Sequence, residues 1–322
     1  MRGIPESGWQ MENKDFHLKS DESLVQSADQ AARLAAFDQY RGLLFSISYR
    51  MLGSVADAED IVQDTFVCWQ SASDEEIRSP RAYLVTIASR LSINHMKSAR
   101  VQREQYVGQW LPEPIVTGIG SDPLALVRID ESISMAFLVL LERLNPVERA
   151  VFLLHEVFEY DYPEIAKVLE QTEANCRQIL HRARKHVAAM RPRFKASPEE
   201  QNKLLQGFLK ATGSGDIDGL VALLAEDAVM RTDGGGKAFA VPNLVQGPSN
   251  IARAIILGRD KFRPKGEVEY RVALVNGAPG IVSYFQRRPS FVFTLDTDGG
   301  RISSIYFITN PDKLAHIPDL AR

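Results

Sequence analysis

The chain has few cysteines, no long apolar run and little net charge, and each absence argues against a class of protein. Its 322 residues include only Cys68 and Cys176, far apart on predicted helix faces, so we expect buried thiols and neither a disulfide nor a metal pair. No apolar run approaches the roughly eighteen residues of a membrane span, and residues 1–30 lack the charged start and apolar centre of a signal peptide. These absences predict a cytoplasmic protein without a membrane contact.

The formal net charge is −3 at pH 7, so any nucleic-acid-binding surface must be local. Seven Lys or Arg and a single Glu lie between Thr172 and Lys195, which makes this segment such a surface. The apolar fraction of 45% and the charged fraction of 25% are ordinary for a globular protein, and the length predicts two or three domains.

Residues 144–195 have the pattern of a helix-turn-helix followed by a basic tail. Asn145 can cap a helix with proline in its first turn, and Glu148 can close a capping box. Asp161-Tyr-Pro-Glu164 repeats this start signal, and Thr172 opens a third helix with one apolar side and largely basic other sides. Such a helix suits the major groove of DNA, although this segment alone is also compatible with a solvated charged helix.

Three amphipathic helices are predicted in the N-terminal part, after a mobile extension over residues 1–30. The first ends at Gly53, the second is capped by Ser54, and the third begins at Pro80. The second helix places four acids and no base within eight residues, namely Asp57, Glu59, Asp60 and Asp64. Acids in a first turn favour the helix dipole, which explains the first of these acids better than the last two.

The far end of the third helix turns basic, in a mixture able to contact phosphates and base edges: Arg90, Asn94, His95, Lys97, Ser98, Arg100 and Arg103. Three glycines and three prolines follow between Gln105 and Pro123. Because proline and glycine interrupt helices, residues 105–128 are predicted to be a linker.

Beyond Pro198 the pattern predicts an α+β domain over residues 198–322. Two helical stretches are expected at 199–210 and 217–224. Strand signals follow at 268–274, 281–285, 291–295 and 302–308, with turns at Asn276-Gly277 and Asp298-Gly299-Gly300. This order predicts an antiparallel meander after the helices.

With these elements placed, residues 35–193 resemble the extracytoplasmic-function (ECF) sigma factors, which are bacterial RNA polymerase subunits that recognise promoters with two helical domains. The resemblance rests on Asp57-Ala-Glu-Asp-Ile-Val-Gln-Asp-Thr-Phe66, Ser79-Pro-Arg-Ala-Tyr-Leu84, Leu144-Asn-Pro-Val-Glu-Arg149 and Leu180-His-Arg-Ala-Arg184. It implies a multidomain fold with an all-α sigma region 2 over residues 31–104 and an all-α sigma region 4 over residues 129–195.

The resemblance also implies core RNA polymerase and promoter DNA as partners. The acidic second helix looks like the segment that grips the β′ clamp helices, and the polymerase surface would also include the β flap. The third helix would bind the melted −10 element as a single strand, and the last helix would read the −35 element. The expected contacts are Asp57, Asp60, Gln63 and Asp64 for polymerase, Asn94, Lys97 and Arg100 for the −10 strand, and Arg177, Gln178, His181, Arg182, Arg184 and Lys185 for the −35 duplex.

Three further stretches resemble the subgroup of these sigma factors with a fused SnoaL-like C-terminal domain. They are Trp110-Leu-Pro-Glu-Pro114, Asp233-Gly-Gly-Gly-Lys237 and Asn310-Pro-Asp-Lys-Leu314. The subgroup implies that the C-terminal domain modulates activity and that no separate anti-sigma factor is needed. The expected interdomain residues are Trp110, Pro112, Glu113, Pro114, Asp233, Gly234, Gly235, Gly236, Lys237, Asn310, Pro311, Asp312, Lys313 and Leu314.

Two positions depart from the family pattern. Glu170 stands in a turn that usually carries Gly, which costs about 1 kcal/mol if the turn needs a positive φ. Asn94 stands where an acid is common, which leaves its contact with the −10 strand open. Trp69 is predicted to be a core residue rather than a wedge that separates DNA strands.

Two other functions stay open at this point. One is a helix-turn-helix repressor or activator that works without polymerase. The other is a DNA-tethered enzyme, because Asp or His can act as an acid or base in a SnoaL-like cone, and it predicts a buried Asp–His or Asp–Tyr pair. The residues available for catalysis are Asp233, Asp296, Asp298 and His316. We expect no catalysis, no cofactor and no metal, since the triple glycine lacks phosphate-loop spacing, while a small molecule in the cone remains an alternative.

Overall fold

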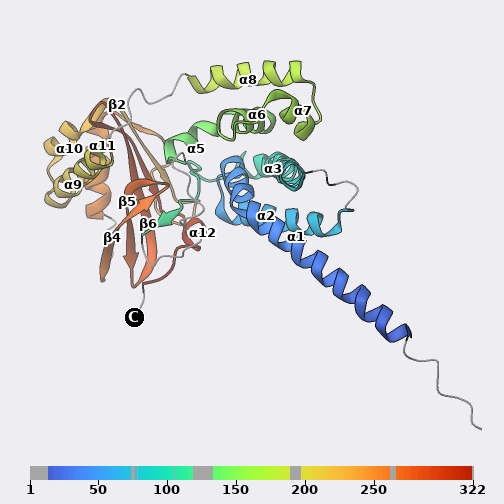
Figure 1. Cartoon of the computed structure of the whole chain (residues 1–322). Coiled ribbons are helices and arrows are strands. Elements are labelled where there is room, and N and C mark those ends of the chain that lie inside the picture. The colour runs from blue at the N-terminus through green and yellow to red at the C-terminus, as the bar shows by residue number, and fades with distance from the viewer. Residues whose placement is uncertain are drawn as a thin grey trace, which may run out of the picture.

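A computed structural model of the chain describes residues 14–73, 77, 79–104, 106–118, 133–188, 197–261 and 266–320. A group of helices forms one side of the molecule, and a sheet flanked by further helices forms the other (Figure 1). In the described residues, no helix is both long and apolar enough to cross a membrane.

The N-terminal helices are α1 (Lys14–Leu52), α2 (Val55–Ser71) and α3 (Pro80–Glu104). Gly53 ends α1 with a φ of +67°, and the Ser54 hydroxyl accepts the Asp57 N–H at 3.1 Å, so both predicted boundaries are confirmed. The extension expected over residues 1–30 is helical from Lys14 onward, because α1 runs unbroken from that residue. Between residues 14 and 52 the sequence contains one glycine and no proline, so nothing stops a helix from extending once its packed half has formed. Residues 1–13 lie outside the described residues.

The second helical group consists of α5 (Met135–Leu141), α6 (Pro146–Glu156), α7 (Tyr162–Leu169) and α8 (Glu173–Ala188). Both predicted capping boxes are confirmed, at Asn145 with Glu148 and at Asp161 with Glu164. Glu170 adopts the left-handed conformation with a φ of +53°. The turn therefore needs the positive φ that the sequence predicts to be costly for a residue with a Cβ.

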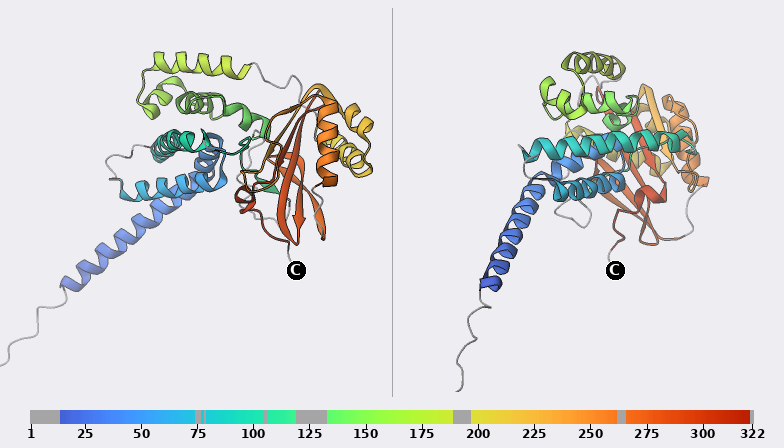
Figure 2. Two further views of the ribbon diagram at one scale, coloured as in Figure 1. Left: turned by 180° about the vertical axis from the view of Figure 1, so that it is seen from behind. Right: turned by 90° about the vertical axis from the view of Figure 1, so that its right-hand side faces the viewer.

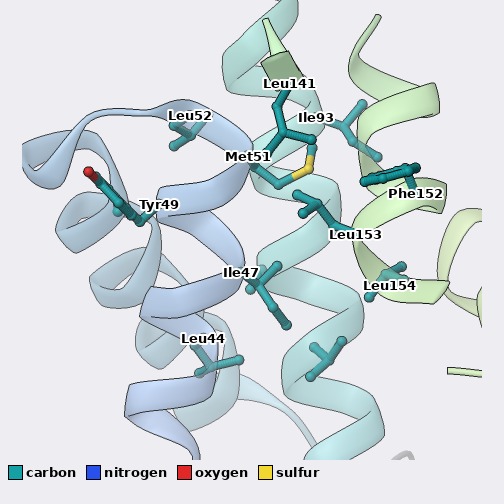
Figure 3. Packing of buried hydrophobic residues seen from close by; sticks show 14 of the residues in the cluster. Leu44, Ile47, Tyr49, Met51, Leu52, Ile93, Leu141, Phe152, Leu153 and Leu154 are labelled. Atoms are coloured by element: carbon teal, nitrogen blue, oxygen red, sulfur yellow. The ribbon is translucent and has the colours of Figure 1, made fainter. Parts of the chain in front are cut away.

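The two helical groups share one hydrophobic core. In Figure 3, side chains from α1, α3, α5 and α6 point into the same space, including Ile47, Ile93 and Leu153. Arg149 of α6 is 1% exposed and donates to the Met51 carbonyl of α1 at 2.7 Å and to the Glu142 carboxylate at 2.8 Å. The buried cation thereby bonds one group of helices to the other.

The C-terminal domain contains α9 (Pro198–Ser214), α10 (Ile217–Leu223), α11 (Pro248–Lys261) and α12 (Pro311–Leu314). Its sheet contains β2 (Leu224–Asp233), β3 (Val245–Gln246), β4 (Val268–Val275), β5 (Ala278–Phe285), β6 (Arg288–Asp298) and β7 (Arg301–Ile308). With β1 (Val116–Thr117) from the linker, the strand order in the described residues is β1-β4-β5-β6-β7-β2-β3.

The predicted meander is confirmed, since β4 to β7 pair antiparallel and the Asn276-Gly277 turn has positive φ at both residues. Strand β2 and helix α11 are not predicted by the sequence pattern. Strand β2 lies parallel to β7, a pairing that no local turn signal specifies. The α+β architecture of the C-terminal domain is confirmed.

The linker is partly built into this sheet. Residues 106–115 are not helical, as predicted, but β1 (Val116–Thr117) pairs antiparallel with β4. Residues 119–128 of the predicted linker lie outside the described residues. The first part of the linker is therefore fixed to the C-terminal domain and is not a free connection.

Each face of the sheet has a different cover. Helices α9, α10 and α11 pack on one face, over Phe293 and Ile305 (Figure 2). On the other face Tyr306 and its neighbours contact Leu111 of the linker, Met135 of α5 and the segment around α12. This second face joins the C-terminal domain to the rest of the chain.

Candidate nucleic-acid interface and interdomain site

The predicted −35 residues lie on α8, at the outer edge of the helical group in Figure 1. All six side chains are exposed, namely Arg177, Gln178, His181, Arg182, Arg184 and Lys185. The first four of these line an open depression. The Arg177 guanidinium lies 4.9 Å from the Tyr162 ring centroid and bonds to Glu173 at 2.8 Å, which orients it along the helix surface.

Arg184 and Arg182 already have acidic neighbours in this structure. Arg184 donates from Nε and Nη2 to Glu156 at 3.0 and 2.5 Å, and Arg182 lies 3.8 Å from Glu148. A phosphate contact by Arg184 would therefore replace the Arg184–Glu156 pair, and a base contact by Arg177 would compete with its bond to Glu173.

The predicted −10 residues lie near the C-terminal end of α3. Asn94 and Lys97 are exposed, and the side chain of Arg100 lies outside the described residues. His95 Nε2 lies 3.4 Å from the Asp57 carboxylate of α2, so one of the predicted polymerase contacts faces α3.

The other predicted polymerase contacts lie on the outer surface of α2. Asp60, Gln63 and Asp64 are exposed, whereas Asp57 is half-buried near the helix start. Trp69 is 3% exposed and donates to the Arg33 carbonyl at 2.9 Å, so the prediction that it is a core residue is confirmed.

The three subgroup motifs meet around the carboxylate of Asp233, at the end of β2. Asp233 is fully buried, and its Oδ2 accepts the Leu111 N–H at 2.8 Å and the Lys313 ammonium at 2.7 Å. Its Oδ1 accepts the Tyr106 hydroxyl at 2.5 Å and the Gly235 N–H at 3.1 Å. Four donors, one of them a cation, thus satisfy a charge that would otherwise be costly to bury.

Lys313 connects this carboxylate to the linker. Its ammonium lies 4.1 Å from the Trp110 ring centroid and 5.2 Å from the Tyr106 centroid, and it donates to the Leu111 carbonyl. Asn310 donates to the Tyr106 hydroxyl at 2.8 Å and caps α12. Burial and the hydrogen bond to the Asp233 carboxylate raise the pKa of Tyr106 above its ordinary value, so this hydroxyl acts as a donor.

Other residues of these motifs lie at the edge of the site. Lys237 bonds to Asp312 at 2.5 Å on the surface. Gly235 has a φ of +59°, and a Cβ there would lie 2.3 Å from Asn310 Nδ2, so the motif needs glycine at this position. Leu314 is buried, Pro112 and Pro114 are buried, and Gly234, Gly236 and Pro311 complete the turns of the two motifs.

The opposite end of the linker motif caps α2. The Glu113 carboxylate accepts the Val55 N–H at 2.6 Å, the Ala56 N–H at 3.3 Å and the Ser54 hydroxyl at 3.1 Å. A carboxylate at a helix N-terminus interacts favourably with the helix dipole. Trp110 packs so closely on Gly53 that a Cβ there would lie 2.7 Å from its ring. One pentapeptide therefore contacts both the start of α2 and the C-terminal sheet.

Several residues of this site could not be found from the sequence. Tyr49 donates to the Glu113 carbonyl at 2.6 Å and accepts the Asn276 amide at 2.8 Å, while His316 Nε2 lies 2.8 Å from the Pro114 carbonyl oxygen. Asn276 carries a hairpin-turn signal, which gives no hint that its side chain reaches across domains. The sequence around Tyr49 and Tyr106 predicts ordinary aromatic residues and does not indicate a role in this site.

An Asp–Tyr pair of the kind expected for a tethered enzyme is present. Asp296 of β6 hydrogen-bonds to Tyr306 of β7, and burial raises the pKa of Asp296 to about 6. The same carboxylate accepts the Ala136 N–H of α5 at 3.1 Å, beside Met135, which is 2% exposed. The first turn of α5 therefore covers this pair. Asp298 and Asp233 lie elsewhere, the latter in the ion pair with Lys313.

Comparison with known proteins identifies the helical groups. Residues 36–101 match the family model for sigma-70 region 2, and residues 134–187 match the model for sigma-70 region 4. The ECF RNA polymerase sigma factor SigJ of Mycobacterium tuberculosis is 37% identical over 295 residues, which cover 88% of this chain and 94% of SigJ. The chain belongs to the ECF RNA polymerase sigma factors.

Two further comparisons extend the result to the whole sigma factor. The probable ECF sigma factor SigI of M. tuberculosis is 30% identical over 87% of this chain and 94% of its own length. The crystal structure of M. tuberculosis SigJ matches with a TM-score of 0.73 at 34% identity, covering 89% of this chain and all of that one. The similarity thus includes the C-terminal α+β domain; sigma region 2 comprises the second part of α1 with α2 and α3, and sigma region 4 comprises α5 to α8.

Proposed function

We propose that this sigma factor docks on core RNA polymerase through the exposed acids of α2 and reads promoter DNA through α3 and α8, under the control of its own SnoaL-like domain. The exposed carboxylates Asp60 and Asp64 favour a basic polymerase surface, with Gln63 between them. On α8, Arg177 suits guanine and Gln178 suits adenine. On α3, Asn94 and Lys97 suit the melted −10 strand.

The compact arrangement of the domains is the observation that carries the regulatory part of this proposal. Regions 2 and 4 share one core, whereas promoter elements more than two helical turns apart would lie more than about 70 Å from each other along duplex DNA. Two domains in contact cannot occupy both elements. The regions must therefore separate before both DNA contacts form.

The SnoaL-like domain is in a position to oppose that separation. It holds region 2 through the linker motif at the Asp233–Lys313 pair, and it holds region 4 through the Asp296 contact with α5. A domain that contacts both regions in the same chain takes the place of a separate anti-sigma factor. We infer that it acts through these contacts and not by catalysis, because the carboxylate of the Asp296–Tyr306 pair is already hydrogen-bonded to the first turn of α5.

Transcription in vitro with core polymerase tests this function. The full chain, a chain ending at Lys195 and a full-length Asp60→Lys/Asp64→Lys variant would be compared on promoter fragments selected by binding. We expect promoter-dependent transcripts from the wild-type chain and none from the charge-reversed variant, with a different yield from the shortened chain. A different result would favour a helix-turn-helix regulator that works without polymerase: no form of the chain gives transcripts, and the charge-reversed variant binds DNA as well as the wild-type chain does.

A further inference from the structure

An arginine of region 2 caps a helix of region 4. Arg90 lies on α3, and its Nε donates to the Val168 carbonyl at 2.8 Å while its Nη2 donates to the Lys167 carbonyl at 3.2 Å. These carbonyls belong to the last turn of α7, where unpaired carbonyl groups and the helix dipole favour a cation. Arg90 therefore occupies the position of a C-terminal capping group, although it comes from another domain.

Glu170 completes this cap. It is the residue that follows α7 in the left-handed conformation, and its Oε1 lies 2.9 Å from Arg90 Nη1. The guanidinium thus contacts three groups of region 4 with its three nitrogens. The Arg90 and Glu170 side chains are 42% and 75% exposed, so this contact is accessible to water and can be exchanged for another.

The same arginine stands in line with the residues proposed to bind the −10 strand. Arg90, Asn94 and Lys97 are spaced by four and three residues, which places them on one face of α3. Asn94 and Lys97 are exposed, whereas the guanidinium of Arg90 is held by α7. Region 4 therefore covers the N-terminal end of a polar and basic stripe whose other end is open.

We propose that Arg90 is a further contact for single-stranded promoter DNA, bound to the end of α7 in the compact chain and transferred to a DNA phosphate when region 4 leaves region 2. The planar guanidinium suits both positions, because it can donate to helix carbonyls and, more strongly, to the charged oxygens of a phosphate. The proposal rests on the −10 role assigned to α3 above. It makes DNA binding and the contact with α7 competitors for one side chain, so DNA binding favours domain separation, and such coupling is reciprocal.

Two measurements on the full chain test this proposal. Spin labels on Val67→Cys in α2 and Ala174→Cys in α8, both exposed positions, report the distance between regions 2 and 4 once Cys68 and Cys176 are replaced by Ala. Binding of a labelled 20-nucleotide single strand of mixed sequence, measured over a range of salt concentrations, reports the number of phosphate contacts. Each phosphate contact contributes about 0.7 to the slope of log K against log salt for a single strand.

The variants separate the two roles of the side chain. We expect the single strand to increase the separated population of the wild-type chain. Arg90→Ala should increase that population without DNA and lower the salt slope by about 0.7. Arg90→Lys should also increase it, since an ammonium cannot reproduce the fork of bonds to α7, but should keep the salt slope. Arg253→Ala, which removes an exposed arginine on α11, should change neither quantity.

Each alternative result has a definite meaning. An unchanged salt slope in Arg90→Ala, or a wild-type distance that DNA does not alter, would overturn the assignment of Arg90 to DNA. An unchanged separated population in Arg90→Ala would overturn its role in holding α7. Lys97→Ala tests the underlying function separately, because a salt slope unaffected by this change would remove the −10 role of α3 whatever Arg90 does.

Discussion

Lys313→Met would remove the cation of a buried ion pair and leave the carboxylate of Asp233 without a counter-charge. The two side chains are 7% and 0% exposed, and their charged atoms lie 2.7 Å apart. Removing one partner of such a pair typically costs about 3–5 kcal/mol, because the remaining charge stays out of water. Asp233 keeps three neutral donors, from Tyr106, Leu111 and Gly235, so we expect a loss of about 3 kcal/mol.

Urea unfolding followed by tryptophan fluorescence measures this loss, because the Lys313 ammonium lies 4.1 Å from the Trp110 ring and the indole reports the state of the site. The variant should also lose protection of the linker against proteolysis, since Leu111 loses a bond to the same ammonium. A weaker site frees region 2 from the C-terminal domain, so the yield of transcripts should change along with stability.

The surface pair of the same two motifs provides a matched control. Lys237 and Asp312 lie 2.5 Å apart, but their side chains are 57% and 62% exposed. Lys237→Met should therefore cost less than about 1 kcal/mol. Asp233→Asn combined with Lys313→Met should recover part of the loss, because the unpaired charge disappears. Equal effects of Lys313→Met and Lys237→Met, or no recovery in the double variant, would refute the reasoning from burial.

Four further predictions follow from the same contacts. The pKa of Asp296 is raised to about 6 in the folded chain, so the native state binds this proton more tightly than the unfolded state does, and the free energy of unfolding should fall as pH rises from about 4 to 6. Unfolding curves at pH 4.5 and 7.5 should show a fall of about 2 kcal/mol for the wild-type chain and none from this group in Asp296→Asn. Glu113→Ala should cost about 1 kcal/mol in the same assay, because α2 loses its external cap, and Glu113→Gln should cost less. Gly53→Ala should destabilise the chain by more than about 1 kcal/mol, since the new Cβ meets both a φ of +67° and the Trp110 ring; a melting temperature equal to that of wild type would contradict this. Arg177→Ala should relax base preference at one −35 position by about 1–3 kcal/mol in binding selections, and a uniform loss across all sequences would mean that Arg177 binds phosphate instead.

Local signals in the sequence predicted local structure well. The caps at Asn145 and Asp161 each depend on a few neighbouring residues, and both are present. The predictions failed where a structure depends on distant partners. Strand β2 is stabilised by parallel pairing with β7 about seventy-five residues later, and α1 extends beyond the part of its sequence with a clear apolar period.

The candidate sites divide in the same way. The motifs on α2, α3 and α8 were recognisable because their residues follow one another along a helix, so spacing alone places them on one surface. The resemblance to a sigma-factor subgroup also predicted that three motifs, one in the linker and two in the C-terminal domain, act together. It did not show that Asp233 would accept hydrogen bonds from Tyr106 and Leu111, more than a hundred positions earlier in the chain.

By itself, the sequence determined most of the helices, their caps, the sheet meander and the separation of acidic from basic surfaces, because each is decided by neighbours within one or two turns. Only the tertiary structure decided that regions 2 and 4 share a core, that Lys313 is buried beside Trp110, and that Arg90 caps α7. The physical reason is that a buried charge or a cap between domains is stable only when distant segments bring enough donors and apolar surface to one place. A local sequence pattern does not predict which distant segments come together.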